Sequence, residues 1–309
     1  MITLKNTGYV RKEADPRNHI LEAVQPPLES AALPVSHVTD ITPFKLPQNV
    51  FMQNQEPSCV AHSVTWTIMV EHWKQTGQFV KLSPRFLYAM CKTQDGLPAD
   101  AGTYLETALN IAKNYGVCED SYFPNNTDLD VATYSNPALI PPEAKANALK
   151  YKIDSYAFLS DRSVNGLNQA IYQNGIVLIG TDVSDWWWTN TAGKNSWNAN
   201  DILPLRPIDA THPEVSGHCV ALYAYGQPWN TQYPTNQWGM NWWSAEWAYG
   251  GRFCFGANYE PTLYEAAVIS YTVKNTTPAP VEQIQVAQPQ ETFLEEIVTI
   301  GEELLDKVI

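Results

Sequence analysis

The spacing of apolar and polar positions changes once along the chain, near residue 150. Before that point apolar residues recur at helical spacing. The segment SCVAHSVTWTIMVEHWKQTG predicts a long helix that Gly77 ends. LSPRFLYAMC predicts a second helix with Ser83 as its N-cap, and TYLETALNIAKNYG predicts a third that stops at Gly116.

Beyond residue 150 the apolar runs become short, β-branched or aromatic, and Gly, Pro and Asn separate them. Such runs are typical of strands. They are YAFLS, GIVLIGTDV, HCVALYAYG, RFCFG and AAVISYTV. The second half is therefore predicted to be mostly strand, and the chain belongs to the α+β class.

Both ends differ from this body. Residues 1–45 are rich in proline, which predicts an extended arm lying on the rest of the protein. Residues 274–309 read as a Pro/Gln linker followed by an amphipathic helix at 291–309. The body itself divides into a helical part, 46–150, and a strand-rich part, 151–273. The C-terminal helix could dock on the body, dimerise or bind a protein partner.

The charge balance argues against two classes of partner. The net charge of −13 offers no basic surface for nucleic acid or for an anionic membrane. No apolar stretch is long enough for a membrane helix, and the N-terminus lacks the apolar core of a signal peptide. We therefore expect a cytoplasmic protein, or one associated with a virion. Seven acids against one lysine follow residue 274, so about half of the net charge lies outside the body.

One of the five cysteines is placed for chemistry. Cys59 follows the turn residues Glu56-Pro57-Ser58 and opens the first predicted helix. Unpaired N–H groups and the positive end of the helix dipole favour a thiolate there, and a thiolate is the nucleophile that acyl transfer needs. Cys91, Cys118, Cys219 and Cys254 are predicted to be buried thiols.

A histidine and an amide far along the chain can complete such a site. His218 begins the strand HCVALYAYG, and Asn236 lies in NQWG before an aromatic-rich turn. Asn236 could orient the imidazole, while Trp238 could shield their hydrogen bond from water.

Several segments together resemble the papain-like cysteine peptidase family. In family order they are QNQEPSCVAHS, LSPRFLY, Gly102-Thr103 before ETAL, YGVCEDSYFPN, NGIVLIG, GHCVALYAYG, and NQWG with WAYGGRFCF. They span residues 46–272. The resemblance implies a helical lobe packed against a β-barrel-like lobe, with the catalytic cleft between them.

The resemblance also implies roles for individual residues. Cys59 matches the nucleophile, His218 the general acid/base and Asn236 the orienting amide. For the oxyanion hole, Gln53 lies at the family spacing before Cys59, whereas Gln55 keeps the Asn-Gln dipeptide but would need a shortened loop; Gln53 is preferred.

Substrate contacts are implied too. Gly102 corresponds to the glycine wall that pairs with the substrate backbone, and Trp238 is assigned to the same cleft. A simple loop glycine is the alternative at 102.

The chain departs from the family pattern in ways that bear on its origin. The first cysteine of the family signature and its disulfide are missing, and residues 184–214 form an insertion before His218. These departures are typical of a divergent bacterial or phage member. Within the insertion, Trp186, Trp187 and Trp188 could wall a substrate pocket or merely cover the strand-rich lobe. His62 could face the cleft, but packing behind the first helix is preferred. The arm could be a propeptide-like segment near the cleft, or an extra strand and belt.

We therefore expect a cysteine endopeptidase that forms a thioester acyl-enzyme on a peptide or protein substrate and needs no cofactor. The cysteines and histidines also lack the paired close spacing of a zinc site. Two alternatives remain. One is a papain-fold structural or binding protein of an assembly such as a virion, with little activity. The other is an amidase that acts on peptidoglycan peptides.

Overall fold

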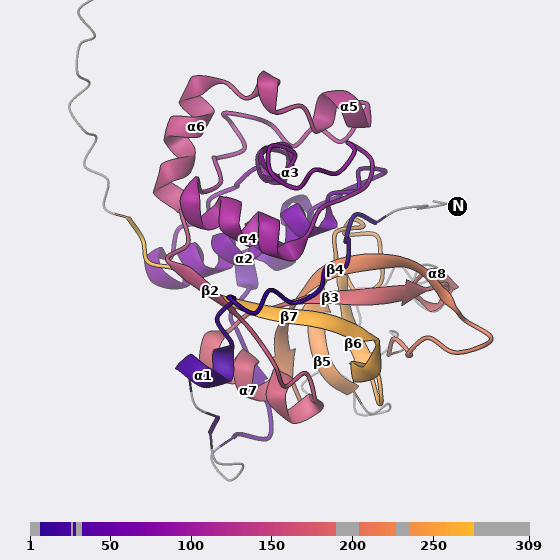
Figure 1. Ribbon diagram of the computed structural model, residues 1–309. Coiled ribbons are helices and arrows are strands. Elements are labelled where there is room, and N and C mark those ends of the chain that lie inside the picture. The colour runs from indigo at the N-terminus through magenta and orange to yellow at the C-terminus, as the bar shows by residue number, and fades with distance from the viewer. Residues whose placement is uncertain (1–6, 26, 29–32, 190–203, 227–234, 275–309) are drawn as a thin grey trace, which may run out of the picture. The chain divides into compact units, whose positions relative to one another are not determined.

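The computed structural model describes residues 7–25, 27–28, 33–189, 204–226 and 235–274 (Figure 1). These residues lie in one compact unit, Met1–Lys274, and residues 275–309 form a second unit. The predicted linker and the helix at 291–309 fall outside the described residues. Within the described ranges, no helix has the length and apolar character that crossing a membrane requires.

The first half of this unit is helical. Its elements are α1 (Leu21–Val24), β1 (His37–Val38), η2 (Thr42–Lys45), η3 (Pro47–Asn49), α2 (Cys59–Thr76), α3 (Pro84–Cys91), α4 (Leu105–Asn114), α5 (Val131–Tyr134), η4 (Pro137–Leu139), α6 (Pro142–Ala148) and η5 (Leu149–Tyr151).

The second half builds the sheet. Its elements are β2 (Ser155–Phe158), α7 (Val164–Asn174), β3 (Val177–Ser184), α8 (Trp186–Thr189), β4 (Glu214–Tyr225), β5 (Thr235–Met240), β6 (Arg252–Gly256), η7 (Glu260–Thr262) and β7 (Leu263–Ser270).

Local signals set the three predicted helices. The long helix α2 ends where Gly77 takes a left-handed conformation, φ 68°, and its N–H bonds the Trp73 carbonyl. That conformation costs glycine little, which is why the helix stops there. Ser83 caps α3 as predicted, because its side chain accepts the Phe86 N–H. The third helix, α4, ends two residues before Gly116.

The sheet is antiparallel throughout, in the order β2-β7-β3-β4-β5-β6, with β1 added to β4. Strand β4 contacts β3, β5 and β1, and α2 packs on it. Figure 1 shows the helices α2 to α6 on one side and the sheet on the other. The predicted α+β two-lobe arrangement is confirmed.

The expectation of a mostly strand second half missed α7. Leu167, Ala170 and Ile171 are buried on one face of this helix, Ser163 caps it and Gly175 follows its end. This is the spacing of an amphipathic helix, but its many polar residues obscure the period. The helix packs on β3, β4 and β7.

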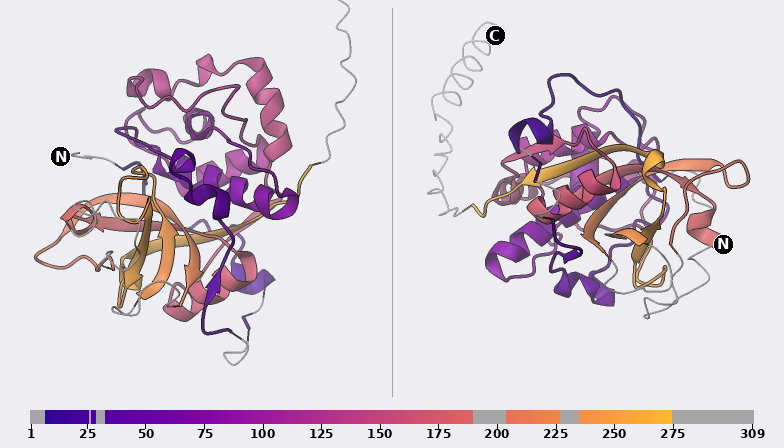
Figure 2. Two further views of the ribbon diagram at one scale, coloured as in Figure 1. Left: turned by 180° about the vertical axis from the view of Figure 1, so that it is seen from behind. Right: turned by 90° about the horizontal axis from the view of Figure 1, so that it is seen from below.

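The arm crosses the sheet side of the helical lobe. In Figure 1 it runs between α4 and the strands β3 and β7, and Tyr9 forms a parallel bridge with Thr103. It then turns at α1. Figure 2 shows the later segment returning along the opposite side of the molecule through β1 to η2, where Phe44 is buried against Trp66 of α2.

Candidate active site

Cys59 is the first residue of α2 and is completely buried. The N–H groups in the first turn of a helix have no partner within the helix. The side chain of Ser58, the N-cap, accepts none of them. Instead, the Cys59 N–H donates to the carbonyl oxygen of Thr7, at 3.3 Å. The thiol therefore lies beside an N–H group that is directed at a carbonyl of another segment.

Gln53 points a second donor at the same oxygen. Its Nε2 lies 3.0 Å from the Thr7 carbonyl oxygen and 2.8 Å from the Glu56 carbonyl oxygen. The Gln53 backbone N–H bonds the Trp242 carbonyl at 2.7 Å, which fixes this loop to the sheet lobe. Gln53 is fully buried, whereas the alternative Gln55 is exposed. Two N–H donors converging on one carbonyl oxygen form the arrangement that stabilises an oxyanion.

His218 lies in β4, opposite Thr181 of β3. Its Nε2 is 2.7 Å from Asn241 Oδ1, and that oxygen also accepts the Trp242 N–H at 2.8 Å. Because Asn241 Oδ1 can only accept, His218 Nε2 carries the proton. The other ring nitrogen, Nδ1, is buried and has no hydrogen-bond partner among the described residues. This tautomer leaves Nδ1 able to take a proton.

The prediction that Asn236 holds His218 is wrong. The Asn236 side chain donates to the Gly256 carbonyl at 3.0 Å and to Glu260. The cause is strand direction: β5 is antiparallel to β4, so its beginning lies beside Tyr225 and its end beside Ala221. Asn236 is therefore at the far end of the ladder, and Asn241, just after β5, is near His218.

A second motif could have revealed this. The run Asn241-Trp242-Trp243 repeats the Asn-x-Trp spacing of Asn236-Gln237-Trp238 five residues later. Trp243 stacks on His218 with ring centroids 5.0 Å apart, and Trp187 meets the imidazole edge-on at 5.6 Å. The shielding predicted for Trp238 therefore falls to these two rings.

Trp238 itself is buried within β5, where it pairs with Ala224 and Cys254. Ala224 is six residues beyond His218 on β4. Of the three insertion tryptophans, Trp187 thus covers the histidine, and Trp188 stacks on Trp243 at 5.1 Å.

One indole ties the cysteine helix to the histidine strand. Trp242 Nε1 donates to Ser63 Oγ on α2 at 2.8 Å and to the Cys219 carbonyl on β4 at 3.0 Å. Ser63 lies one turn after Cys59, and Cys219 follows His218 directly. This bridge fixes α2 against β4 close to both predicted catalytic residues.

Burial keeps both groups neutral in this arrangement. Removal from water raises the pKa of the Cys59 thiol, and the neighbouring Cys219 adds to the effect. Removal from water also lowers the pKa of His218 to about 4, although the hydrogen bond that its Nε2 donates to Asn241 opposes this shift. The structure therefore presents a thiol and a neutral imidazole.

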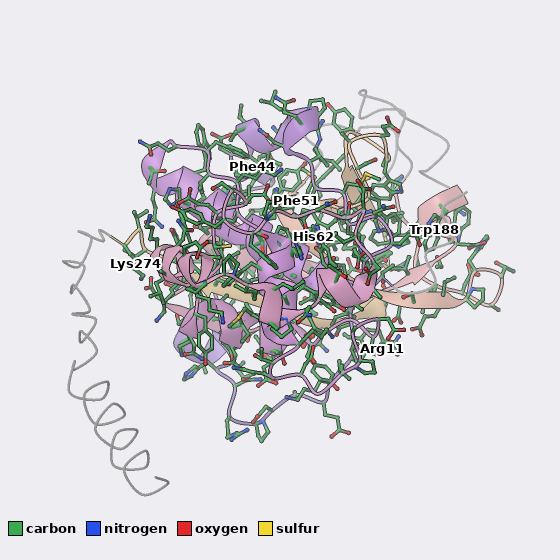
Figure 3. The ribbon with its side chains drawn as sticks, turned by 90° about the horizontal axis from the view of Figure 1, so that it is seen from above. Arg11, Phe44, Phe51, His62, Trp188 and Lys274 are labelled. Atoms are coloured by element: carbon green, nitrogen blue, oxygen red, sulfur yellow. The ribbon has the colours of Figure 1, made fainter. Side chains whose placement is uncertain are left out.

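His62 packs behind the start of α2, as predicted. Its Nδ1 bonds the Ser58 carbonyl at 2.9 Å, and its ring meets Phe51 edge-on at 5.3 Å. Figure 3 labels both residues in a view from above. Burial lowers the pKa of His62 to about 4. This histidine supports the loop before Cys59.

The arm pairs with the backbone at Gly102-Thr103. The Thr103 N–H bonds the Gly8 carbonyl at 2.9 Å, and the Val10 N–H bonds the Thr103 carbonyl at 3.1 Å. A Cβ on Gly102 would lie 2.2 Å from the Gly8 oxygen, and a Cβ on Gly8 would lie 2.0 Å from the Pro57 oxygen. Backbones approach this closely only where side chains are absent. The position predicted to pair with a substrate thus holds the protein's own arm.

The Tyr9 side chain packs against two glycines of the sheet. A Cβ on Gly180 of β3 would meet the Tyr9 ring at 2.4 Å, and one on Gly217 of β4 would meet it at 3.0 Å. The phenol hydroxyl is hydrogen-bonded to Glu265 of β7. Burial raises the pKa of Glu265 to about 7, and the hydrogen bond from Tyr9 partly opposes this.

The other cysteines have no catalytic setting. All five are free and buried, and burial raises the pKa of Cys91, Cys118, Cys219 and Cys254 to about 12. Among the described residues no three His, Cys, Asp or Glu side chains gather as a metal site.

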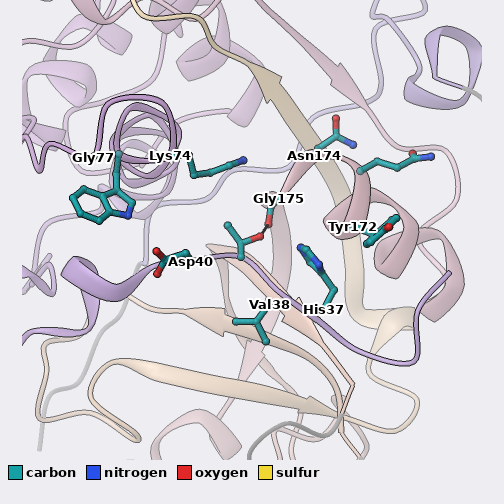
Figure 4. A pocket seen from close by; sticks show the side chains of 11 residues that line it. His37, Val38, Asp40, Lys74, Gly77, Tyr172, Asn174 and Gly175 are labelled. Carbon is teal, nitrogen blue, oxygen red and sulfur yellow. Dashed lines mark hydrogen bonds between the residues drawn. The ribbon is translucent and has the colours of Figure 1, made fainter.

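A pocket of about 620 Å³ lies at the other end of α2 (Figure 4). It is lined by Lys74 and Gly77 of that end, by β1, and by Tyr172 and Gly175 at the end of α7. An 18-residue helix is roughly 27 Å long, so this pocket is distant from Cys59. None of its lining residues is a cysteine, and the pocket takes no part in thiol chemistry.

Comparison with known proteins places this geometry in context. Residues 45–258 match the sequence model described as "Papain family cysteine protease". No curated protein matches the chain significantly.

Solved structures share the fold. Xylellain, a cysteine protease from Xylella fastidiosa, is 22% identical with a TM-score of 0.68, over 86% of this chain and 96% of that one. Digestive procathepsin L 3 of Tenebrio molitor is 18% identical with a TM-score of 0.61, over 87% and 78%. Procathepsin B S9 from Trypanosoma congolense is 15% identical with a TM-score of 0.64, over 88% of each chain.

Proposed function

The chain belongs to the papain family of cysteine proteases and is a cysteine-type peptidase; on this basis we propose that it is an endopeptidase whose nucleophile is Cys59 and whose general acid/base is His218. Asn241 replaces Asn236 as the orienting amide, and Gln53 with the Cys59 N–H forms the oxyanion hole. One observation carries the proposal: both N–H donors point at a single peptide carbonyl oxygen, that of Thr7, beside the thiol.

The chemistry follows from these positions. The Cys59 thiol transfers its proton to His218 Nδ1, and the sulfur attacks the carbonyl carbon of a peptide bond. The carbonyl oxygen becomes an oxyanion held by the Cys59 N–H and Gln53 Nε2. His218 then returns the proton to the leaving amine, and a thioester remains on Cys59. Water, deprotonated by His218, then attacks the thioester, and His218 passes that proton to the departing sulfur, which frees the acid product and restores the thiol.

Asn241 acts through His218. Its Oδ1 accepts a hydrogen bond from the Nε2–H group of His218. This bond keeps Nδ1 unprotonated and directed at the proton of the Cys59 thiol. Trp243 and Trp187 exclude water from this bond, so it is stronger than the same bond in solvent.

The arm residues 7–12 hold the enzyme latent in this proposal. Thr7 fills the oxyanion hole, Gly8 and Val10 occupy the backbone contacts of Thr103, and Cys59 is completely buried while the arm is seated. A substrate needs the same donors, so the arm and the substrate exclude each other. This is the propeptide-like interpretation of the arm, and it predicts that displacing residues 7–12 raises activity.

The test uses full-length chains. In Gly8→Val the new side chain cannot occupy the space against Pro57, and a positive φ of 102° also disfavours it, so the arm is displaced. We expect this variant to hydrolyse casein faster than the wild type and to react faster with iodoacetamide at Cys59. Adding Cys59→Ala should abolish hydrolysis. Incubation with bacterial cell walls in parallel distinguishes a peptidoglycan amidase.

Two results contradict the proposal. One is hydrolysis that persists in the Gly8→Val/Cys59→Ala chain. The other is an inactive Gly8→Val chain whose Cys59 reacts at the slow rate of an ordinary thiol, unchanged by His218→Ala.

A further inference from the structure

The arm carries an arginine into a site that the catalytic steps do not use. Arg11 Nη2 donates to Asp182 of β3 and lies 2.5 Å from Glu214 Oε1 of β4. Its guanidinium carbon is 3.6 Å from the centre of the Tyr264 ring of β7. Three adjacent strands therefore supply two carboxylates and one aromatic face to a single side chain. Figure 3 labels Arg11 at the edge of the molecule.

One carboxylate of this site is buried and held in place by a hydrogen bond. The Asp182 side chain is 1% exposed, and its second oxygen accepts the Tyr264 hydroxyl at 2.6 Å. A buried carboxylate is costly without a compensating charge, and Glu214 adds a second negative charge beside it. Arg11 is the cation that the structure places on both. Without Arg11, the pair would be left with unmatched charge and would attract another cation.

The geometry favours a guanidinium over an ammonium. A guanidinium is planar, so it can stack on Tyr264 while its edge donates to the carboxylates. An ammonium could bond the carboxylates but could not stack in the same way. The site therefore distinguishes arginine from lysine, and both from a neutral side chain.

The position along the cleft connects this site with catalysis. Asp182 directly follows Thr181, which pairs with His218. In the arm, Arg11 is four residues beyond Thr7, the residue whose carbonyl lies between Gln53 and Cys59. The backbone in between is held at Thr103. A peptide bound along the same backbone contacts would bring one of its own side chains over Asp182.

We propose that Asp182, Glu214 and Tyr264 form an arginine subsite of the cleft, which Arg11 fills while the arm is seated and a substrate arginine fills when the arm is displaced. The inference rests on the proposed function, because it assigns substrate selection to the same cleft. The substrate class is a peptide with an arginine a few residues from the cleaved bond. The enzyme itself is acidic, with a net charge of −13, so it repels acidic peptides.

Binding is measured on the full chain carrying Gly8→Val and Cys59→Ala, so that no cleavage occurs. The probes are fluorescent heptapeptides with the sequence of residues 7–13, TGYVRKE, and its reversed order, each with Arg, Lys or Gln at the Arg11 position. Fluorescence anisotropy gives the dissociation constants. We expect the Arg peptide of at least one order to bind about tenfold more tightly than its Gln counterpart, with Lys between them.

The matched variants are Asp182→Asn, Glu214→Gln and Tyr264→Leu. Asp182 is buried, so its substitution could unfold the chain, whereas Glu214 and Tyr264 are half-exposed and their variants should fold. Each should reduce the Arg-to-Gln ratio toward one, while the affinity for the Gln peptide stays nearly constant. Any of three results would overturn the proposal. They are equal binding of the Arg and Gln peptides, an Arg-to-Gln affinity ratio that none of the variants changes, and no binding of any peptide.

Hydrolysis by the Gly8→Val chain then separates the two claims. Fluorogenic peptides of unrelated sequence, with Arg or Gln placed at successive positions from the cleaved bond, should show one position where Arg raises kcat/KM. Hydrolysis with no such position would overturn the arginine subsite and leave the peptidase intact, with the site anchoring only the arm. Selective binding of these unrelated Arg peptides without any hydrolysis would support the subsite and contradict the peptidase.

Discussion

The helix side and the sheet side of the proposed active site differ in how far apart their determinants lie in the sequence. On the helix side, Gln53 and Cys59 are six residues apart, and the turn at Pro57 and Ser58 joins them. Helix α2 begins at Cys59 itself. The signals that place the proposed nucleophile are thus all within one short segment.

On the sheet side, the determinants are spread over strands and the turns between them. His218 lies at one end of β4, while its partner Asn241 follows the end of β5. Which asparagine meets the histidine depends on strand direction and on the register of β4 with β5, which shifts between Leu222 and Ala224. Side-chain placement in a sheet is therefore a property of pairing, which no single segment encodes.

The same family resemblance therefore locates site residues more reliably on the helix side than on the sheet side. A nucleophile at a helix start can be located from its own neighbours. An orienting amide can be located only once the ladder that carries it is known. Substitutions on the two sides test this contrast, with activities measured in chains that also carry Gly8→Val.

Cys59→Ala should have the largest effect. Because it removes the atom that forms the thioester, kcat should fall by about 10⁴-fold or more. Thermal unfolding should change little, since the side chain is small. The matched control is Cys118→Ala, which removes another buried thiol and should retain activity. Equal losses in the two variants, measured with a fluorogenic peptide, would contradict the assignment of the helix side.

Gln53→Ala should have the second largest effect on activity. Loss of one oxyanion donor lowers kcat by about 10²- to 10³-fold with a smaller change in KM, because the contact strengthens as charge develops on the oxygen. Gln55→Ala is the control, since its side chain is exposed. If Gln55→Ala were the more damaging change, the loop before Cys59 would have the other register.

Asn241→Ala tests the proposed orienting amide on the sheet side. Without its oxygen the imidazole can turn or change tautomer, so kcat/KM should fall by about 10- to 100-fold. Since the Asn241 hydrogen bond raises the pKa of His218, its loss should also shift the pH profile of kcat/KM toward lower pH.

Asn236→Ala is the matched control for this change. Its side chain bonds Gly256 and Glu260, so we expect activity within about twofold of the parent chain and no shift of the profile. A larger effect at Asn236 than at Asn241 would restore the sequence-based assignment.

Glu265→Gln should have the smallest effect, and it is tested in the chain with its arm seated. Burial raises the pKa of Glu265 to about 7, above its value in the unfolded chain, so the folded state binds the proton more tightly. Its contribution to stability is therefore present at low pH and lost as pH rises through about 7.

The measurement is Tm at pH 6.5 and pH 8 in Glu265→Gln, with exposed Glu143→Gln as control. The fall in Tm between these pH values should be smaller in Glu265→Gln, by about 2 °C. Glu56, whose pKa burial also raises to about 7, keeps part of the dependence in every variant. An unchanged fall in Glu265→Gln would place the charged carboxylate in solvent.

Much of the fold could be predicted because its signals are local. Ser83 before α3 and Gly77 after α2 mark helix ends, and the β-branched run before Ser184 marks β3. Helix α7 was missed because polar residues dilute its apolar face. The arm could be predicted as an extended segment from its prolines. Its path, however, depends on close backbone contacts at Gly8 and Gly102, where no side chain would fit, and sequence alone does not reveal them.

By itself the sequence determined the α+β class, the helix start that carries Cys59, and the strand that carries His218. It also favoured Gln53, by its spacing from Cys59, as the proposed oxyanion donor. These depend on residues that are neighbours in the chain, where backbone preferences and capping act. Tertiary structure decided that Asn241 rather than Asn236 holds His218 and that Trp187 and Trp243 cover it. It also decided that the arm places the Thr7 carbonyl between Gln53 and Cys59, and Arg11 on Asp182. Those contacts join segments up to about 200 residues apart, and strand register and close backbone packing, which the chain acquires only on folding, select them.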